Sequence, residues 1–366
     1  MVSTMHDCAR SVSANRSLIG LQGNGEEQMT DYLITSIGGP EPKVIVDAID
    51  SAGDLRRLSD LACDGPPGPL AVSPNRQQLY VSVQVDGQHL ARSYRIGDDG
   101  DLTLTGQTEM GGNPCHLSTD NTGRFLLGAY YSDGMATTDP IDTDGALGGQ
   151  RTSHNPTELR AHYIQTDPSN RFAFVPHVDE ANCVYQFRFD EATGKLTAND
   201  PPQVSPPPGQ GPRHLCFHPS GRYAYTNGEQ GSSVTIWDYD ESTGCLSAKE
   251  TLTSLPEEGF DEPNHPSQLH ISPNGRFLFS GNRGHHSVAG FMVNEDGSLQ
   301  PTGLTPADPN PRPITVSPDS RFLFAAGNTE EGRLARWQID QDSGERSETT
   351  HYNCGPVSWV ISMRRD

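Results

Sequence analysis

Side chains able to bind anions or move protons recur at fixed distances from a turn that the chain repeats. The turn has the form Ser/Asp/His-Pro-x-Gly/Asn/Ser, and the position directly after it, the post-turn position, is an arginine in five of the six copies. Nine residues before the position that follows it come Gly68, Cys115, His162, Arg213, Ser267 and Arg312. Seven residues after that position come Gln84, Tyr131, Val178, Glu229, Arg283 and Asn328. Guanidinium groups bind carboxylates and phosphates, and imidazoles or carboxylates transfer protons, so this set suits work on a small anionic or carbonyl substrate.

The repeat itself predicts the elements that carry these residues. An apolar strand precedes each turn and a second follows it, as in LCFHPSGRYAYTNG and LHISPNGRFLFSGN. The position after the turn falls at Gln77, Arg124, Arg171, Arg222, Arg276 and Arg321. A period of about 45–50 residues with alternating apolar side chains is typical of a four-stranded propeller blade. We therefore expect an all-β propeller of antiparallel blades.

Six turns are visible, and the two ends of the chain supply a seventh blade. The C-terminal CGPVSWVISM is similar to a first strand, while DYLITSIGG and KVIVDAID near the start are similar to a second and a third. One blade would be closed by both termini, which removes free sheet edges. We expect residues 1–29 to be a disordered leader and residues 30–366 to be a single seven-bladed domain.

Blade geometry then predicts where the polar residues meet. The first strand of a blade lines the channel and the second returns, so the start of one and the end of the other open on the same face. We expect His162, Glu229, Arg213 and Arg283 to be catalytic there. Substrate contacts are expected from His116, Tyr131, His214, Asn282, Arg312 and Asn328. The turns at the other face are expected to be structural.

Composition excludes several classes of function. The net charge is −21, which disfavours nucleic acid and anionic lipid as partners, and no apolar run is long enough to span a membrane. Seven scattered cysteines without a CxxC motif favour reduced thiols in the cytoplasm. We expect no cofactor and no metal, since adjacent His285 and His286 would point oppositely on a strand. The three tryptophans are expected to pack within blades.

At these residues the chain resembles a known family. GQGPRHLCFHPSGRYAYTNGEQGSSVTIWDYD, ISPNGRFLFSGNRGHHSVAGF and GPVSWVIS resemble the seven-bladed bacterial 6-phosphogluconolactonases, a family that also contains fungal 3-carboxy-cis,cis-muconate lactonising enzymes. The resemblance spans roughly residues 30–366. It implies an active-site histidine at His162, arginines at Arg213 and Arg283, and a glutamate at Glu229. The chain departs from the family at Ala129-Tyr130-Tyr131, where an Asn-Tyr pair before a glycine is frequent, and at Val175-Pro176-His177, where Val-Pro-Asp is frequent.

The resemblance implies hydrolysis of a small sugar-type or acidic lactone by base-activated water. Arginines would stabilise the oxyanion and the substrate's anionic group. Either His162 or Glu229 is the base, with a slight preference for His162 because an unperturbed imidazole pKa near 6.5 needs less tuning. Two alternatives stay open: a lactonising cycloisomerase, in which proton transfer to carbon replaces water attack, and a propeller that only binds a partner protein. Oligomeric state does not follow from the sequence.

Overall fold

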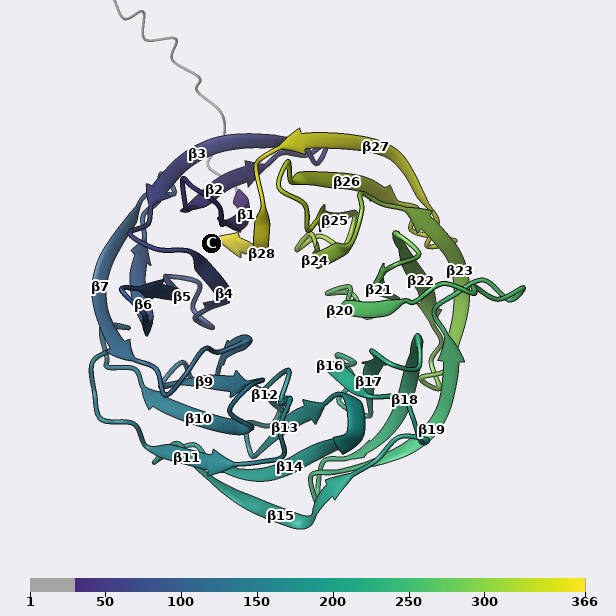
Figure 1. Cartoon of the computed structure of the whole chain (residues 1–366), viewed down its shortest axis with the longest axis horizontal. Helices are drawn as coiled ribbons and strands as arrows, with labels where there is room; N and C mark the ends of the chain where they lie inside the picture. The colour runs from purple at the N-terminus through teal and green to yellow at the C-terminus, as the bar shows by residue number, and fades with distance from the viewer. Residues whose placement is uncertain (1–29, 366) are drawn as a thin grey trace, which may run out of the picture.

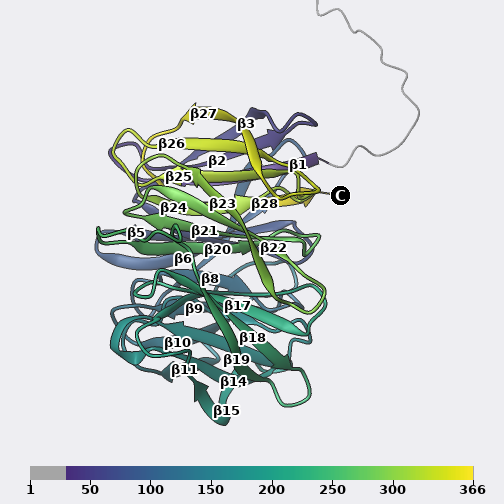
Figure 2. The ribbon, with the colours of Figure 1, turned by 90° about the vertical axis from the view of Figure 1, so that its right-hand side faces the viewer.

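The computed structural model describes residues 30–365, which form seven four-stranded antiparallel sheets around a central axis. Figure 1 looks along that axis and shows the sheets as blades of a propeller, with one strand of each blade facing the centre. Figure 2 shows the ring edge on, with the blade that holds both termini at the top and the blade of β15 at the bottom. The expected propeller is confirmed, and the expected leader lies outside the described residues.

The blades follow one another around the ring, with the strands below given from the centre outward. Blade 1 contains β28 (Val357–Arg365), β1 (Thr30–Ile37), β2 (Lys43–Ile49) and β3 (Leu55–Ala62). Blade 2 contains β4 (Pro67–Val72), β5 (Gln78–Val85), β6 (Gln88–Ile96) and β7 (Leu102–Glu109). Blade 3 contains β8 (His116–Thr119), β9 (Phe125–Tyr130), β10 (Met135–Pro140) and β11 (Ser153–Pro156). Blade 4 contains β12 (Gln165–Thr166), β13 (Phe172–His177), β14 (Cys183–Asp190) and β15 (Lys195–Val204), with a short 3-10 helix, η1 (Asp179–Ala181), after β13.

The last three blades carry most of the residues expected at the site. Blade 5 contains β16 (Pro212–Phe217), β17 (Tyr223–Gly228), β18 (Ser233–Asp240) and β19 (Cys245–Thr253). Blade 6 contains β20 (His265–Ile271), β21 (Phe277–Arg283), β22 (Ser287–Val293) and β23 (Leu299–Pro306). Blade 7 contains β24 (Pro311–Val316), β25 (Phe322–Gly327), β26 (Arg333–Ile339) and β27 (Arg346–Asn353).

The termini close blade 1, as the sequence predicts. Strand β28 pairs antiparallel with β1, and Ile34 lies opposite Ile361. The guanidinium group of Arg364 donates two hydrogen bonds to Asp31, at 2.8 and 3.1 Å. Because β28 comes from the C-terminus and its three partners come from the start of the chain, this pairing joins the ring into a closed structure.

The repeated turns are structural, and their sequence explains their shape. The residue just before the post-turn position has a positive φ, for example 74° at Gly275 and 59° at Asn170. Gly and Asn adopt that conformation most readily, which accounts for the motif. The following arginine then lies over the next aromatic ring, as Arg276 does at 5.4 Å from the centre of Phe277. These arginines hold the turn and lie outside the channel site.

The apolar core is divided into clusters between neighbouring blades. One such cluster joins Phe277 and Phe279 of blade 6 to Trp337 of blade 7. Another joins Phe174 of blade 4 to Trp237 of blade 5. Each blade is therefore held by its two neighbours, which fixes the positions of the inner strands around the channel.

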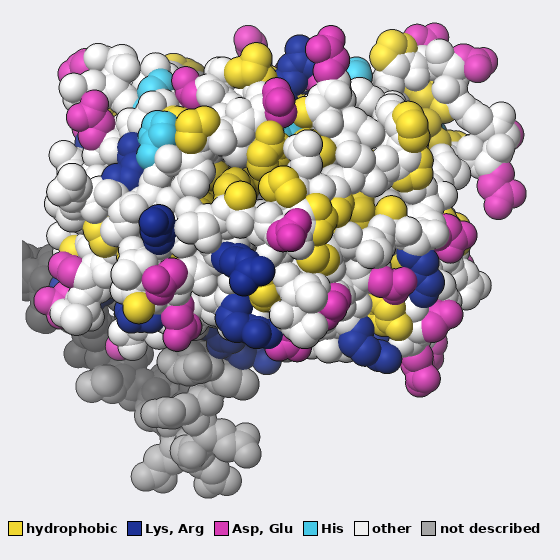
Figure 3. All heavy atoms as spheres, turned by 90° about the horizontal axis from the view of Figure 1, so that it is seen from below, with side chains coloured by type: hydrophobic (Ala, Val, Ile, Leu, Met, Phe, Trp, Pro, Cys, Tyr) yellow, Lys and Arg dark blue, Asp and Glu magenta, His cyan; other side chains and the backbone are white. Residues whose placement is uncertain are grey.

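The outer surface carries the excess acidic charge without one large patch on the side shown in Figure 3. Acidic side chains are spread over that side and are interspersed with arginine, lysine and apolar side chains. No helix within residues 30–365 is long and apolar enough to cross a membrane.

Candidate active site

A β-bulge at the start of the inner strand of blade 5 places the first functional residues. Pro212 pairs with Gly228, but Leu215 pairs with Thr226, so one extra residue lies on β16. The backbone N–H of His214, which this irregularity frees, donates instead to the side-chain oxygen of Asn227 at 3.0 Å. Bulges re-aim side chains, and here the neighbouring residues Arg213 and His214 both reach the channel. Blades 2, 6 and 7 have the same irregularity at the same place.

Glu229 joins two of the expected arginines. It follows β17 directly, and its carboxylate accepts from Arg213 Nε at 3.1 Å and from Arg283 Nη2 at 2.5 Å. Arg213 comes from blade 5 and Arg283 from the end of β21 in blade 6, so the glutamate bridges two blades. The structure thus brings together three of the four residues expected to be catalytic.

The two arginines differ in exposure. The Arg213 side chain is 2% exposed and also donates to the backbone carbonyl of Ser267, whereas the Arg283 side chain is 23% exposed. Burial is the main cause that lowers the pKa of Arg213, to about 9; the charge of Glu229 opposes this shift and the charge of Arg283 adds to it. Arg213 therefore stays charged at neutral pH. Arg213 is therefore held in place by its partners, while Arg283 can meet a ligand.

His162 lies near these groups in an uncharged state. It is 6% exposed, and its Nδ1 is buried without a hydrogen-bond partner among the described residues. Burial, and then the charge of Arg213, hold the pKa of His162 well below its usual value. This removes the reason for preferring His162 as the base, which was its unperturbed pKa. A neutral imidazole can instead donate a hydrogen bond, as histidines with lowered pKa do elsewhere.

Tyr131 and Arg312 also lie at this end of the channel. The ring of Tyr131 meets that of His162 edge to face, with centroids 5.6 Å apart. Arg312, the second residue of β24, is exposed to solvent. The surrounding protein still desolvates it, and this together with the charge of Arg283 lowers the pKa of Arg312. The site therefore holds Arg213, Arg283 and Arg312 with Glu229, and the ion pair of Arg160 and Asp179 lies near Tyr131.

The other four expected substrate contacts have different surroundings. Asn282 is fully buried, and its amide bonds to Ser254 and Ser287, so it supports the loops behind the site. Asn328 is exposed in the loop after β25. His116 and His214 line the channel in a deeper layer of rings, where the centroid of His214 is 5.8 Å from that of His162.

Several channel residues were missed by the sequence analysis. Tyr163 and Trp359 belong to the same ring layer, and Trp359, which packs against the apolar cluster of blades 1 and 2, also lines the channel. Tyr163 and His214 both lie eight residues before the post-turn position, so the spacing test applied there would have found the layer. His285 and His286 lie in the turn after β21, not on a strand. No group of three potential ligands among the described residues is arranged to hold a metal ion.

Comparisons with known proteins show which family the chain belongs to. Residues 38–362 match the family model described as "Lactonase, 7-bladed beta-propeller". A 6-phosphogluconolactonase of Pectobacterium carotovorum is 34% identical over 337 residues, which cover 91% of this chain and 99% of that protein. A 6-phosphogluconolactonase of Klebsiella pneumoniae is 33% identical, over 88% of this chain and 96% of that protein. The solved structure of a periplasmic gluconolactonase of Pseudomonas aeruginosa has a TM-score of 0.82 and 28% identity, covering 91% of this chain and 99% of that one. This chain therefore belongs to the seven-bladed β-propeller lactonase family.

Proposed function

We propose that this protein hydrolyses a small lactone that carries an anionic group, of the 6-phosphogluconolactone type. The observation that carries the proposal is the bridge from Arg213 through Glu229 to Arg283 at one end of the channel. Arg160, Arg213, Arg283 and Arg312 outnumber the two carboxylates near this end, Glu229 and Asp179, in a chain whose net charge is −21, so this end concentrates positive charge where an anion would bind. The names of the relatives, 6-phosphogluconolactonase and gluconolactonase, support the same substrate class.

The more exposed arginines suit the substrate's anionic group. The Arg283 side chain is 23% exposed and Arg312 is exposed, and a guanidinium group binds phosphate or carboxylate with two parallel hydrogen bonds. Arg213 is enclosed and already bonded to Glu229 and to Ser267. Its role is to orient the carboxylate and to add positive potential at the position where the oxyanion forms.

Glu229 is the better candidate for the base. Its side chain is 15% exposed, so a water molecule can reach it, whereas His162 Nδ1 is fully enclosed. In the proposed reaction, Glu229 takes a proton from water as the water oxygen attacks the lactone carbonyl carbon. The ring C–O bond then breaks, and the proton passes from Glu229 to the departing alkoxide. Neutral His162 would donate an N–H hydrogen bond to the carbonyl oxygen as its charge grows.

A panel of lactones tests the proposal. Acid release would be followed by pH-stat with 6-phosphogluconolactone, glucono-1,5-lactone and carboxymuconolactone, each corrected for spontaneous opening. We expect one proton released per lactone opened and the highest kcat/KM for the phosphorylated lactone. Absence of any catalysed opening in the panel would refute lactone hydrolysis. Formation of a lactone from a carboxylated muconate without acid release would instead identify a cycloisomerase.

The proposal also places the enzyme in the cytoplasm, where the six cysteines of the described residues, all free, would stay reduced. Cell fractionation tests this, and recovery in a periplasmic fraction would contradict it.

A further inference from the structure

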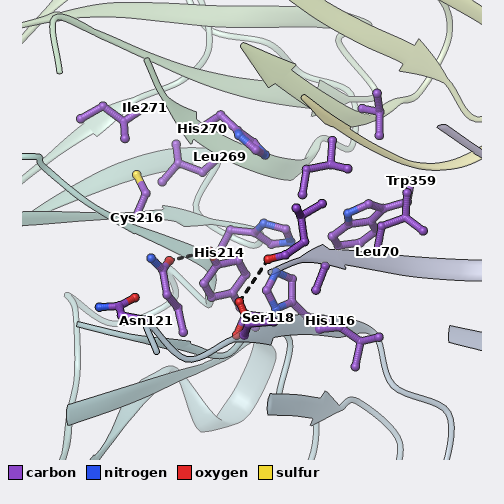
Figure 4. A pocket seen from close by; sticks show the side chains of 18 residues that line it. Leu70, His116, Ser118, Asn121, His214, Cys216, Leu269, His270, Ile271 and Trp359 are labelled. Carbon is purple, nitrogen blue, oxygen red and sulfur yellow. Dashed lines mark hydrogen bonds between the residues drawn. The ribbon is translucent and has the colours of Figure 1, made fainter. Parts of the chain in front are cut away.

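A second chamber occupies the channel on the side of the repeated turns. Its volume is about 300 Å³, near the lower end for ligand pockets. The inner strands β4, β8, β12, β16, β20 and β28 supply most of its walls. Figure 4 shows side chains from these strands around the space, among them His116, His214, His270 and Trp359. None of the residues proposed for lactone hydrolysis lines it.

A layer of rings separates this chamber from the arginine site. The centroids of His116 and Tyr163 are 3.8 Å apart, and those of Tyr163 and His214 are 4.8 Å apart. Trp359 completes the layer, with its ring centroid 5.6 Å from that of His116. His162 of the arginine site lies beyond His214, and the ring centroids of these two histidines are 5.8 Å apart. The two ends of the channel therefore offer different surroundings to a ligand.

The chamber carries no formal charge. Its lining contains neither Asp, Glu, Lys nor Arg. Burial lowers the pKa of His116 to about 3 and that of His270 to about 4, and burial together with the charge of Arg213 lowers the pKa of His214. All three imidazoles are therefore neutral at neutral pH. An anion would meet no cation here, which contrasts with the other end of the channel.

Polar groups with spare hydrogen-bonding capacity point to a ligand that makes hydrogen bonds. The hydroxyl of Ser118 donates to the carbonyl of Ile164 at 2.8 Å, and its oxygen can still accept a hydrogen bond from a ligand. Gln165 accepts from the hydroxyl of Tyr163 at 2.7 Å, which leaves its amide N–H groups for a ligand. Ring faces and aliphatic side chains cover the remaining wall, from Leu70, Leu269 and Ile361 among others.

We propose that this chamber binds an uncharged, polyhydroxylated ring, such as a free monosaccharide. A sugar ring has apolar faces that would lie against Trp359 and Tyr163, and a polar edge that would bond to Ser118 and Gln165. A hydrocarbon would leave those polar groups unsatisfied, and an anion would find no countercharge. The inference is independent of the lactonase proposal, because the two sites share no lining residue among those named as catalytic.

Tryptophan fluorescence tests the proposal directly. Trp237 and Trp337 are 0% and 2% exposed within the blades, whereas Trp359 lines the chamber. Titration of the full chain with D-glucose, D-galactose and D-xylose should give a saturable change in emission for at least one sugar. Trp359→Phe should abolish that change, and calorimetry would show whether this variant still binds. Gluconate and phenol serve as anionic and aromatic comparators and should not bind in this chamber.

Variants that fill the chamber locate the bound sugar. Val72→Phe and Ile271→Phe enlarge partly exposed lining residues from two different strands, so at least one should fold with an unchanged melting temperature. Each folded variant should lose sugar binding while keeping lactone hydrolysis. An Arg213→Ala/Arg283→Ala variant should do the reverse. The proposal is overturned if no sugar binds saturably, if only phenol or gluconate binds, or if binding survives filling of the chamber and is lost with the arginines.

Discussion

Arg213 and Glu229 lie opposite each other at one end of blade 5, and Arg213 Nε donates to Glu229 Oε2 at 3.1 Å. Arg213 is the second residue of β16, and Glu229 is the first residue after β17, so the antiparallel pairing of these strands brings them together. The second carboxylate oxygen accepts from Arg283 of blade 6. The carboxylate is thus fixed from two sides, which preorganises it for the reaction proposed above.

Removing an arginine from this end should affect catalysis, whereas removing one from a turn should not. Arg283→Ala should lower kcat/KM for the best lactone by about 10²–10³, because it deletes a cation that faces the substrate. Arg276→Ala is the matched control, since Arg276 lies over Phe277 in a repeated turn and should leave kcat/KM within about twofold. Steady-state kinetics on both variants would make the comparison. If the Arg276→Ala variant were inactive and the Arg283→Ala variant active, the active site would lie at the face of the repeated turns.

The buried histidines predict loss of stability in acid. The pKa values of His177 and His270 are lowered to about 4 and that of His116 to about 3, in each case mainly by burial. The unfolded chain, with histidine pKa values near 6.5, binds these protons first as pH falls. Each such histidine should therefore cost about 1.4 kcal/mol of unfolding free energy per pH unit between about 6.5 and its folded pKa.

The melting temperature should accordingly fall steeply between about pH 6.5 and pH 4.5, and calorimetry over that range measures it. His177→Gln, which can keep one hydrogen bond to Thr157, should lessen the slope. A melting temperature that is constant over this range would show that the histidines are not held neutral.

Closure of blade 1 by β28 should control the stability of the whole ring. Val360 is 1% exposed and belongs to the apolar cluster between blades 1 and 7, so Val360→Ala should cost about 2 kcal/mol. Arg365→Ala, which removes an ion pair to the fully exposed Asp98, should change stability by less than about 0.5 kcal/mol. Deletion of residues 357–366 should abolish cooperative unfolding. Urea denaturation measures all three, and a deletion variant that melts like the full chain would show that the ring does not need this strand.

The fold was predictable because each blade repeats a local pattern. The turn residues at Gly275 and Asn170 adopt positive φ, and the apolar strands on either side alternate, so each unit can be recognised without its neighbours. The closure by β28 could also be predicted, since its sequence matches a first strand that lacks the rest of its blade. Strand order around the ring then follows from sequence order.

The site could be predicted only to the level of strand ends. Glu229 and Arg283 end or follow second strands, and this placed them at one face. The bulge between Pro212 and Leu215 determines that Arg213 and His214 both reach the channel. Its signal, which was missed by the sequence analysis, is a Pro-x-x-Leu/Ile segment that recurs at the bulges of blades 2, 6 and 7. The His162 side chain is buried by residues of blades 3, 4 and 5 together. Its lowered pKa could therefore not be predicted from its neighbours in the sequence.

The most direct test of the account is kcat/KM for the best lactone in Glu229→Gln, measured by pH-stat beside His162→Gln. Glutamine keeps the shape of the side chain at residue 229 and removes the proton acceptor, so kcat should fall by about 10²–10³ with little change in KM. His162→Gln keeps an N–H donor and should lose less activity. The enzyme should also show no inflection near pH 6.5 from His162, since the pKa of this histidine lies well below that value. Wild-type turnover in Glu229→Gln would contradict the assignment of this carboxylate as the base, and with it the proposed mechanism.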